Sequence, residues 1–454
     1  MGRPNILYIH SHDTGRYVQP YGHQVPTPNL QRLAEQGVLF RQAFCAAPTC
    51  SPSRASLLTG QCAHSSGMLG LAHRGFSLHD YRQHIVHTLR QVGYQSVLIG
   101  VQHVAREAEV VGYDRIIPLP SRDADGVASA ATNFLRSIPR EPFFLSVGFV
   151  ETHREFCAPG PEEDARYCLP PHPLPDTLQT RQDMAAFKAS ARVLDEGIGA
   201  VLDALEASGL ADRTLVICTT DHGIAFPGMK CNLTDHGIGV MLILRGPFTS
   251  AQSRPFGSAQ DRPTGFVGGQ VCDALVSHVD LFPTICDLLD LERPAWLQGQ
   301  SMMPLIRGEA AQINGEIFAE VTYHAAYEPQ RAVRTQRWKY IRRFDERRGP
   351  VLPNCDDSPS KDVWLQHGWQ DRPPTSERLY DLIFDPNESH NLATDPSMTE
   401  VLDEMRGRLD RWMQGTGDPL LRGPVPAPAG ARVNDPDGLS PREPTIAIPG
   451  AEPD

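Results

Sequence analysis

The sequence predicts an α/β protein built on a mainly parallel sheet that helices flank on both sides. Four apolar runs have the continuous hydrophobic character of strands that are buried on both faces. They span residues 5–9, 96–100, 143–150 and 214–220. Helix-like stretches separate them, and strands that alternate with helices indicate a parallel sheet covered on both sides. We therefore predict one large α/β domain over residues 1–310.

The stretches between these strands carry the signals of helix ends. They span residues 27–37, 53–60, 84–93 and 191–209. Thr27 and Pro28 suit the cap and the first turn of the first helix. Glycine stands at positions 37, 93 and 209, where the C-terminal caps of helices belong. These stretches are expected to form the layers that cover the sheet.

The character of the chain changes after residue 310. Residues 316–324, 330–344 and 377–385 have the short alternating pattern of a small antiparallel sheet. Residues 398–417 form an amphipathic pattern that ends in glycine. We therefore predict an α+β subdomain over residues 311–422. Residues 423–454 are rich in Pro and Gly and cannot build a core, so we expect a tail on the surface or on a partner subunit.

Composition excludes some classes of protein. The formal charge of −12 argues against a nucleic-acid partner, because neutralising phosphates requires a basic face. No apolar run approaches the roughly 20 residues that span a bilayer, and the first residues lack the pattern of a secretory leader. We expect a cytoplasmic protein without a membrane partner.

The ten cysteines contain no CxxC pair, so neither a zinc ribbon nor a dense disulfide scaffold is indicated. Cys157 and Cys168 have the spacing for a bridge across the loop between them. We expect free thiols there if the compartment is reducing.

Polar residues follow each of the four predicted strands. In an open parallel sheet, ligands bind beyond the carboxyl ends of the strands. A single histidine at such a place is usually an ordinary loop residue, but the repeated pattern favours a shared metal site with acid–base histidines around it. Mixed His and Asp ligands suit Mn, Fe or Zn, whereas all-oxygen ligands suit Ca or Mg. The residues are His10, His12, Asp13, Arg16, His103, Glu151, His153, Asp221 and His222.

A cysteine lies beside a predicted helix start in the segment PTCSPSRASLLTG, residues 48–60. The free N–H groups of the first turn favour negative charge, and Pro52 is tolerated there. Arg54 is four residues beyond Cys50 and can reach an anion held near it. These residues fit a reactive thiolate or a buried structural cysteine, and both interpretations stay open at this point.

The same segment is very similar to the sulfatase signature C-x-P-x-R followed by a leucine-rich turn. Residues 27–60 resemble the N-terminal region of that family, and residues 331–345 and 377–396 resemble its C-terminal segments. Within the family, the chain most resembles the heparan N-sulfoglucosamine sulfohydrolase group. The resemblance extends from Pro4 to about residue 400. It implies an alkaline-phosphatase-like α/β fold with a smaller C-terminal sheet domain.

The resemblance also implies catalytic roles. Cys50 would be oxidised to formylglycine by a maturase, and one oxygen of the aldehyde hydrate would attack sulfur. Arg54 would hold the hydrate, Lys230 would contact the sulfate, and His103 and His153 would transfer protons.

One divalent metal is implied as well, held by His12, Asp13, Asp221 and His222. The chain departs from the family at three places. The usual Asp-Asp pair is His12-Asp13, the usual Asp-Asn pair is Asp221-His222, and Val101 replaces the lysine of the motif Gly-Lys-x-His. The histidines favour Mn or Zn, with Ca as the alternative.

Three hypotheses follow for the function. The first is hydrolysis of a sulfate ester or sulfamate on a sugar or another small anionic molecule. The second is a formylglycine-dependent phosphonate or phosphate ester hydrolase, because the Asp221-His222 pair resembles the pair found in such hydrolases of the same superfamily. The third is a non-catalytic binding protein, which the intact cysteine segment argues against. One Lys and one Arg suit a singly charged sulfate better than a phosphate dianion.

Other residues are predicted with less specific roles. His236 is a candidate substrate-binding residue, and Glu320 or His324 is a candidate for the pocket rim from the second domain. The remaining histidines are expected at the surface or at the pocket rim, and a homo-oligomer is considered. These histidines are His64, His73, His79, His84 and His87.

Overall fold

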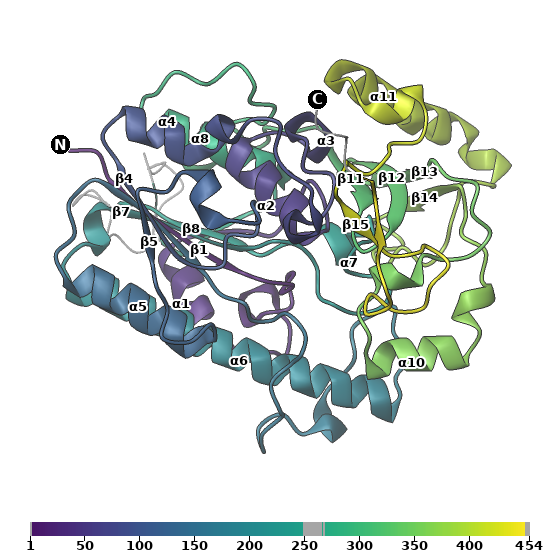
Figure 1. Ribbon diagram of the computed structural model, residues 1–454, viewed down its shortest axis with the longest axis horizontal. Coiled ribbons are helices and arrows are strands. Elements are labelled where there is room, and N and C mark those ends of the chain that lie inside the picture. Colours follow the sequence, from purple (N-terminus) through teal and green to yellow (C-terminus); the bar gives the residue numbers. More distant parts are fainter. Residues whose placement is uncertain (1, 248–265, 267, 450–454) are drawn as a thin grey trace.

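The computed structural model describes residues 2–247, 266 and 268–449. An eight-stranded sheet forms the centre of the larger unit (Figure 1), in the order β5-β4-β6-β1-β7-β8-β2-β9. The strands from β5 to β7 are parallel, and β8 is antiparallel to both of its neighbours. The prediction of a mainly parallel sheet is confirmed. The strands are β1 Asn5–Ser11, β2 Val38–Phe40, β4 Gln95–Gly100, β5 Arg115–Ile117, β6 Phe143–Gly148, β7 Thr214–Thr220, β8 Leu242–Arg245 and β9 Gln270–Cys272.

The four strands predicted from the sequence are the four adjacent central strands β4, β6, β1 and β7. Neighbouring residues of β1 pack into two different cores. Leu7 and Ile9 belong to the core on one side of the sheet, and Ile6 and Tyr8 to the core on the other. Both faces of the strand are therefore apolar, which explains its continuous hydrophobic run.

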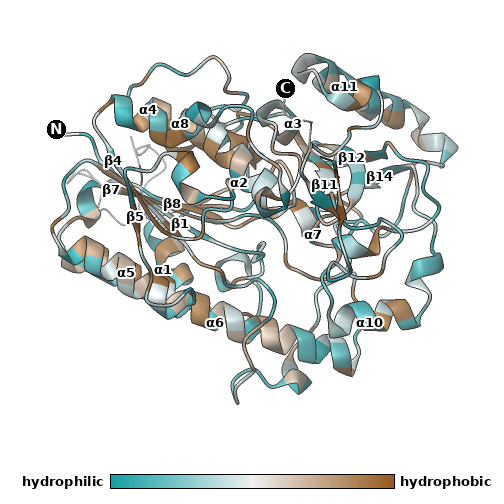
Figure 2. Cartoon of the chain, viewed as in Figure 1, coloured by the Kyte–Doolittle hydropathy of each residue, from teal (hydrophilic) through white to brown (hydrophobic). Residues whose placement is uncertain are grey.

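Helices cover both faces of this sheet. Figure 1 shows α1, α5 and α6 on one side and α2, α4 and α8 on the other. Figure 2 shows the central strands as strongly hydrophobic, whereas α5 and α6 also carry hydrophilic residues. This is the pattern of amphipathic helices that lie between a sheet and solvent. The helices are α1 Pro28–Gln36, α2 Cys50–Thr59, α4 Ile85–Gln91, α5 Ala124–Arg136, α6 Leu178–Ala207 and α8 Leu281–Leu288.

Helix α6 begins 13 residues before the predicted stretch. Thr177 caps it, since the side chains of Thr177 and Thr180 each accept a hydrogen bond from the other residue's backbone N–H. The added turns bury Met184 and Phe187 in a third apolar cluster. The sequence pattern did not indicate this early start, because the helix directly follows a proline-rich segment with Pro171, Pro173 and Pro175.

The second unit contains an antiparallel sheet in the order β11-β12-β13-β14, as predicted. The run 330–344 contributes to two strands that are joined by a turn in which Thr335 N–H donates to the carbonyl of Trp338. Leu409 and Met413 of α11 pack on Val333 and Tyr340 of the sheet. The elements are β11 Ile317–Tyr323, β12 Tyr327–Arg334, β13 Trp338–Arg343, β14 Glu377–Asp381, α10 Pro359–Gln366 and α11 Thr399–Thr416.

Several short elements complete the described chain. None of the helices within the described ranges is long and apolar enough to cross a membrane. All ten cysteines lie in those ranges and are free thiols, Cys157 and Cys168 included. The short elements are β3 Ala43–Phe44, β10 Val276–Ser277, β15 Arg432–Val433, β16 Ile446–Ala447, α3 Ala63–Ser66, α7 Asp235–Ile238 and α9 Met303–Ile306.

The C-terminal tail lies on its own chain. Asn434 accepts a hydrogen bond from Arg74 and donates its backbone N–H to the carbonyl of Ala325. The carbonyl of Leu439 accepts a hydrogen bond from Lys361. The tail thus contacts both units, and the boundaries at residues 310 and 422 stay a prediction.

A buried ion network joins α7 of the first unit to the second sheet. Asp235 lies 2.5 Å from the ammonium of Lys339 and 3.0 Å from the guanidinium of Arg334. Glu388 lies 3.0 Å from the same ammonium. Burial raises the pKa of Asp235, but Lys339 and Arg334 outweigh it and hold that pKa well below its usual value.

We predict that Asp235→Ala destabilises the protein by about 3–5 kcal/mol, because it removes the buried carboxylate that pairs with Arg334 and leaves Lys339 with Glu388 alone. Chemical denaturation followed by circular dichroism measures the change. The control is Asp273→Ala, which removes an ion pair with Arg41 whose side chains are more than half exposed and should cost less than about 1 kcal/mol. Equal losses in both variants would contradict this account.

Candidate active site

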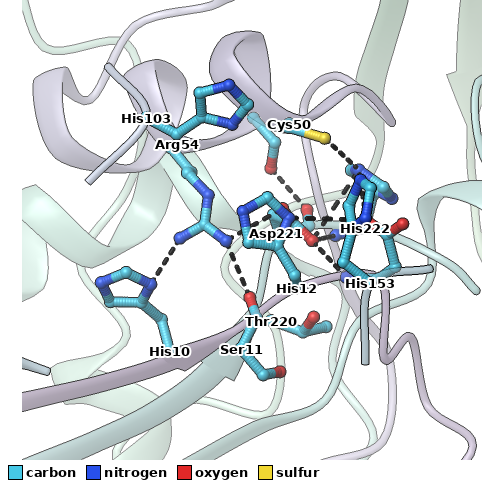
Figure 3. Close-up of polar contacts among 12 residues, drawn as sticks. His10, Ser11, His12, Cys50, Arg54, His103, His153, Thr220, Asp221 and His222 are labelled. Atoms are coloured by element: carbon cyan, nitrogen blue, oxygen red, sulfur yellow. Dashed lines mark hydrogen bonds and ion pairs between the residues drawn. The ribbon is translucent and has the colours of Figure 1, made fainter. Parts of the chain in front are cut away.

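The carboxyl ends of the four central strands bring the predicted polar residues to one edge of the sheet (Figure 3). The loops that follow the strands are bonded to one another. The N–H of His12 donates to the carbonyl of Glu151 at 3.0 Å, and the N–H of Gly15 donates to the carbonyl of His222 at 2.9 Å. The N–H of Asp13 donates to Oδ1 of Asp221 at 2.9 Å. Asp13 is held with φ of +52°, a left-handed conformation that is costly for a residue with a side chain.

Cys50 is the first residue of α2, three residues before the predicted stretch begins. It is 2% exposed, and its Sγ lies 3.4 Å from Nε2 of His222. The hydroxyl of Ser53 donates to the carbonyl of Asp221 at 2.5 Å. The first turn of the helix is therefore bonded to the end of β7, and this contact fixes the position of Cys50.

Arg54 is buried and binds the ends of two strands. Its NH2 donates to the carbonyl of Ser11 at 2.9 Å and to Oδ2 of Asp221 at 3.0 Å, and its NH1 contacts Nδ1 of His10. Its Nε is buried and has no hydrogen-bond partner in the described part of the chain. Arg54 therefore orients Asp221 and retains one N–H that an anion near Cys50 can use.

The residues predicted to bind metal lie close enough to do so. One ligand atom from each of His12, Asp13, Cys50 and Asp221 lies within 4.8 Å of all the others. Nδ1 of His12 is 3.0 Å from Oδ2 of Asp221, and Nε2 of His222 is 3.3 Å from Oδ1 of Asp13. Within the described ranges, Nδ1 of His12 and Oδ1 of Asp13 are buried without a hydrogen bond. These atoms fit a divalent cation with mixed nitrogen and oxygen ligands.

His222 is oriented for this site by its other nitrogen. Its Nδ1 lies 2.9 Å from the carbonyl of Gly223, and a proton on Nδ1 would leave the lone pair of Nε2 facing Asp13 and Cys50. Such an outer hydrogen bond is the usual way in which a ligating imidazole is held.

Lys230 lies between two carboxylates. Its ammonium is 2.8 Å from Asp13 and 2.9 Å from Asp356, and 3.5 Å from Nε2 of His153. Burial lowers the pKa of Lys230, but the two carboxylates outweigh it and raise that pKa well above its usual value. Lys230 is therefore a permanent positive charge inside the site.

These charges act on the cysteine. Burial raises the pKa of the Cys50 thiol, but Lys230 and His222 outweigh burial and hold that pKa well below its usual value. The same balance acts on Asp221. Burial raises the pKa of Asp221, but His222 and Arg54 outweigh burial and hold that pKa well below its usual value. The site is thus built to hold negative charge at position 50.

His103 and His153 lie at the margin of the site, where both are only partly buried. Their rings lie 5.6 Å and 5.4 Å from the ring of His12. Nδ1 of His103 is buried without a hydrogen bond among the described residues, and its Nε2 lies 2.9 Å from Nδ1 of His73. The structure therefore brings both predicted proton carriers to the metal ligands.

The second unit supplies two further residues. His324 follows β11 and is buried, and burial together with Lys230 lowers its pKa to about 3. Asp356 precedes α10 and pairs with Lys230. His324 was one of the two rim candidates, whereas the other, Glu320, binds His64 at 3.0 Å. Asp356 carries no strand-end or helix-end signal, so the sequence pattern could not indicate it.

His236 is the candidate residue that the structure does not bring to this group. Its Nδ1 bonds to the hydroxyl of Tyr17 at 2.9 Å. It lines a separate cavity of about 300 Å³ together with Arg16 and Asp235. Glu151, from the strand-end pattern, instead accepts a hydrogen bond from the first N–H of α5.

The fold thus places a buried cysteine at a helix N-terminus beside a group of possible metal ligands, an arrangement that suits a hydrolase. The family model Sulfatase matches residues 4–291, and the chain belongs to the sulfatase family. The model N-sulphoglucosamine sulphohydrolase, C-terminal, matches residues 260–361. The protein is therefore a sulfuric ester hydrolase, and the predicted family and fold are confirmed.

Individual relatives agree with this assignment. Human N-sulphoglucosamine sulphohydrolase is 28% identical over 481 residues, which cover 92% of each chain. An ulvan-active sulfatase of Formosa agariphila is 27% identical, over 92% of this chain and 76% of the relative. The structure of BT4656 in complex with its substrate D-glucosamine-2-N,6-O-disulfate has a TM-score of 0.70 and 19% identity, and covers 93% of this chain and 99% of that chain. Because this structure is only 19% identical to the chain, the likeness shows the fold alone.

We predict that the protein binds one divalent ion at His12, Asp13, Asp221 and His222, and that Mn and Zn bind more tightly than Ca because imidazole nitrogens are poor ligands for Ca. Elemental analysis and calorimetric titration of the protein with each metal measure this. Asp221→Asn should weaken binding at least about 10-fold.

The matched control is His236→Ala, which removes a histidine outside the group and should leave affinity unchanged. A metal that bound Asp221→Asn as tightly as the unaltered protein would contradict the site.

Proposed function

We propose that the protein hydrolyses a sulfate ester or sulfamate with a formylglycine formed from Cys50 and one divalent metal. The observation that carries the proposal is the position of Cys50 at a buried helix N-terminus beside Lys230 and His222. Oδ1 of Asp13 and Nδ1 of His12 lie in the same group and make no hydrogen bond within the described ranges. A formylglycine-generating maturase is the partner that this requires. The resemblance to sulfatases supports the modification.

The buried charges suit a singly charged substrate. Asp13, Asp221 and Asp356 contribute three negative charges, and Arg54 and Lys230 contribute two positive ones. His12 and His222 must be neutral to bind a metal, and the group then carries one negative charge, which a divalent cation turns into one positive charge. A sulfate monoester, a sulfamate or a singly charged phosphonate ester neutralises it, whereas a phosphate dianion leaves an excess negative charge that is costly in a buried site.

Each residue has a task that follows from its contacts. Formylglycine supplies a hydrated aldehyde oxygen as nucleophile, and the metal supplies a Lewis acid for sulfate oxygens. Lys230 provides a fixed positive charge for the sulfate. Arg54 keeps Asp221 oriented, and its free Nε–H is available to stabilise negative charge near position 50. His103 and His153 hold or donate protons at the open margin of the site.

A sulfated amino sugar is the substrate class that we propose. The human relative is named for N-sulphoglucosamine, and the structural neighbour holds a glucosamine disulfate. His324 is buried, and its Nδ1 has no hydrogen bond within the described ranges. Oδ2 of Asp356 lies 2.9 Å from the ammonium of Lys230. An imidazole nitrogen and a carboxylate suit the hydroxyl and amine groups of a sugar.

We predict that protein from a host that contains the maturase carries an aldehyde at position 50. Mass spectrometry of the peptide that contains Cys50 measures this, because oxidation of a thiol to an aldehyde lowers the peptide mass. Cys50→Ala should lose at least about 1,000-fold in turnover of N-sulfoglucosamine, since the nucleophile is removed.

Cys62→Ala is the matched control, since Cys62 is another buried cysteine just beyond the same helix, and it should keep most of the activity. Aryl sulfate and aryl phosphonate complete the substrate panel. An unmodified thiol in active protein would contradict the formylglycine mechanism. Faster turnover of the aryl phosphonate than of both sulfated substrates would overturn the substrate class.

A further inference from the structure

His73 lies directly against His103 at the margin of the site. Nδ1 of His73 is 2.9 Å from Nε2 of His103. The two ring centroids are 5.2 Å apart with an angle of 11° between the ring planes, so the two rings lie side by side and their facing nitrogens point at one another. His73 is exposed, whereas Nδ1 of His103 is buried. The pair therefore forms a continuous line of nitrogen atoms from solvent to the interior.

The backbone on both sides of this pair is fixed. His73 belongs to a short turn in which the N–H of Ala72 donates to the hydroxyl of Ser51 at 3.0 Å, so the turn is bonded to the first turn of α2. His103 has φ of +55°, a costly conformation that the surrounding structure must maintain. The side chain of Gln102 supports it by accepting a hydrogen bond from the N–H of Ala105 at 2.9 Å.

The inner end of the line lies beside the proposed reactive residue. Figure 3 shows His103 and Cys50 on the same side of the site, and the ring of His103 lies 5.6 Å from the ring of His12. Nδ1 of His103 has no hydrogen-bond partner in the part of the chain that the structure describes. A buried nitrogen of this kind is available to a substrate atom.

We infer that His73 is a positioning residue that relays protons between solvent and His103, an inference that rests on the proposed function. A hydrogen bond between two imidazoles holds one proton. When Nδ1–H of His103 gives its proton to the departing oxygen or nitrogen, an O–H or N–H bond forms there. Nε2 of His103 then takes the proton of His73 Nδ1, and Nε2 of His73 takes one from a hydronium ion or a buffer acid. Both rings end neutral with the proton on Nε2. The proton that the hydrate releases when the aldehyde forms again goes to Nδ1 of His103, the Nε2 proton of His103 returns to Nδ1 of His73, and His73 releases its Nε2 proton to solvent.

The relay makes a specific demand on the substrate. A sugar amine or alcohol is a poor leaving group and must be protonated as it departs, whereas nitrophenolate leaves as an anion. A residue that only shaped the loop would affect both substrates alike. The dependence on the leaving group therefore separates a proton relay from a structural role.

The test compares His73→Gln with the unaltered metal-loaded enzyme. Glutamine can still donate a hydrogen bond to His103 but cannot pass a proton on. We expect kcat for N-sulfoglucosamine to fall at least about 10-fold, since acid–base groups contribute about 100- to 10,000-fold. The kcat for 4-nitrophenyl sulfate should stay within about 2-fold, and KM for both should be unchanged. Added imidazole should restore part of the lost rate in His73→Ala.

His79→Gln is the matched control, because His79 is an exposed histidine of the same stretch and should behave as unaltered enzyme. Metal content and the formylglycine fraction are measured for every variant. Equal losses on both substrates, or unchanged kcat for N-sulfoglucosamine in His73→Gln, would overturn the relay. Failure of the unaltered enzyme to hydrolyse either sulfate would instead overturn the proposed function.

Discussion

The carboxylate of Asp221 is the contact on which the site depends. It accepts hydrogen bonds from the backbone of Asp13 and from Arg54, and lies 3.0 Å from Nδ1 of His12. These contacts bind helix α2 and strand β1 to the end of β7. Because the carboxylate is buried and surrounded by cations, its removal would leave Arg54 without its partner inside the protein, which is strongly destabilising. Asp221 thus holds the start of α2 through its backbone carbonyl and orients the predicted metal ligands through its side chain.

The departures from the sulfatase pattern concern the atoms around this carboxylate. His12 and His222 stand where the resemblance leads us to expect Asp and Asn, and both imidazoles face the carboxylates. Val101, where the resemblance leads us to expect lysine, directly follows β4. The structure provides a different neighbour for His103, because His73 approaches it from another loop.

The sequence was sufficient to predict the sheet centre and which polar residues gather at its edge, whereas their catalytic and metal-binding roles stay predictions. The strands β1, β4, β6 and β7 are buried on both faces, so their hydrophobic runs are unambiguous, and parallel strands must place their following residues at one edge. The short strands β2, β5, β8 and β9 bury too few residues to produce a pattern. His73 and Asp356 could not be assigned because they lie in loops that only tertiary packing brings to Lys230 and His103. His236 was misleading for the same reason, since a loop sequence does not show which way a ring points.

The burial of Cys50 also has a consequence for when the proposed modification of this residue can occur. His222, which contacts the sulfur, is 172 residues further along the chain. Ribosomes add about 5 to 20 residues per second, so about 10 to 35 seconds separate the synthesis of the cysteine from that of the strand that encloses it. During that interval the segment around Cys50 has no β7 to pack against. Under the proposed formylglycine mechanism, the long separation in sequence gives the maturase a period of access to Cys50 before the sheet edge closes.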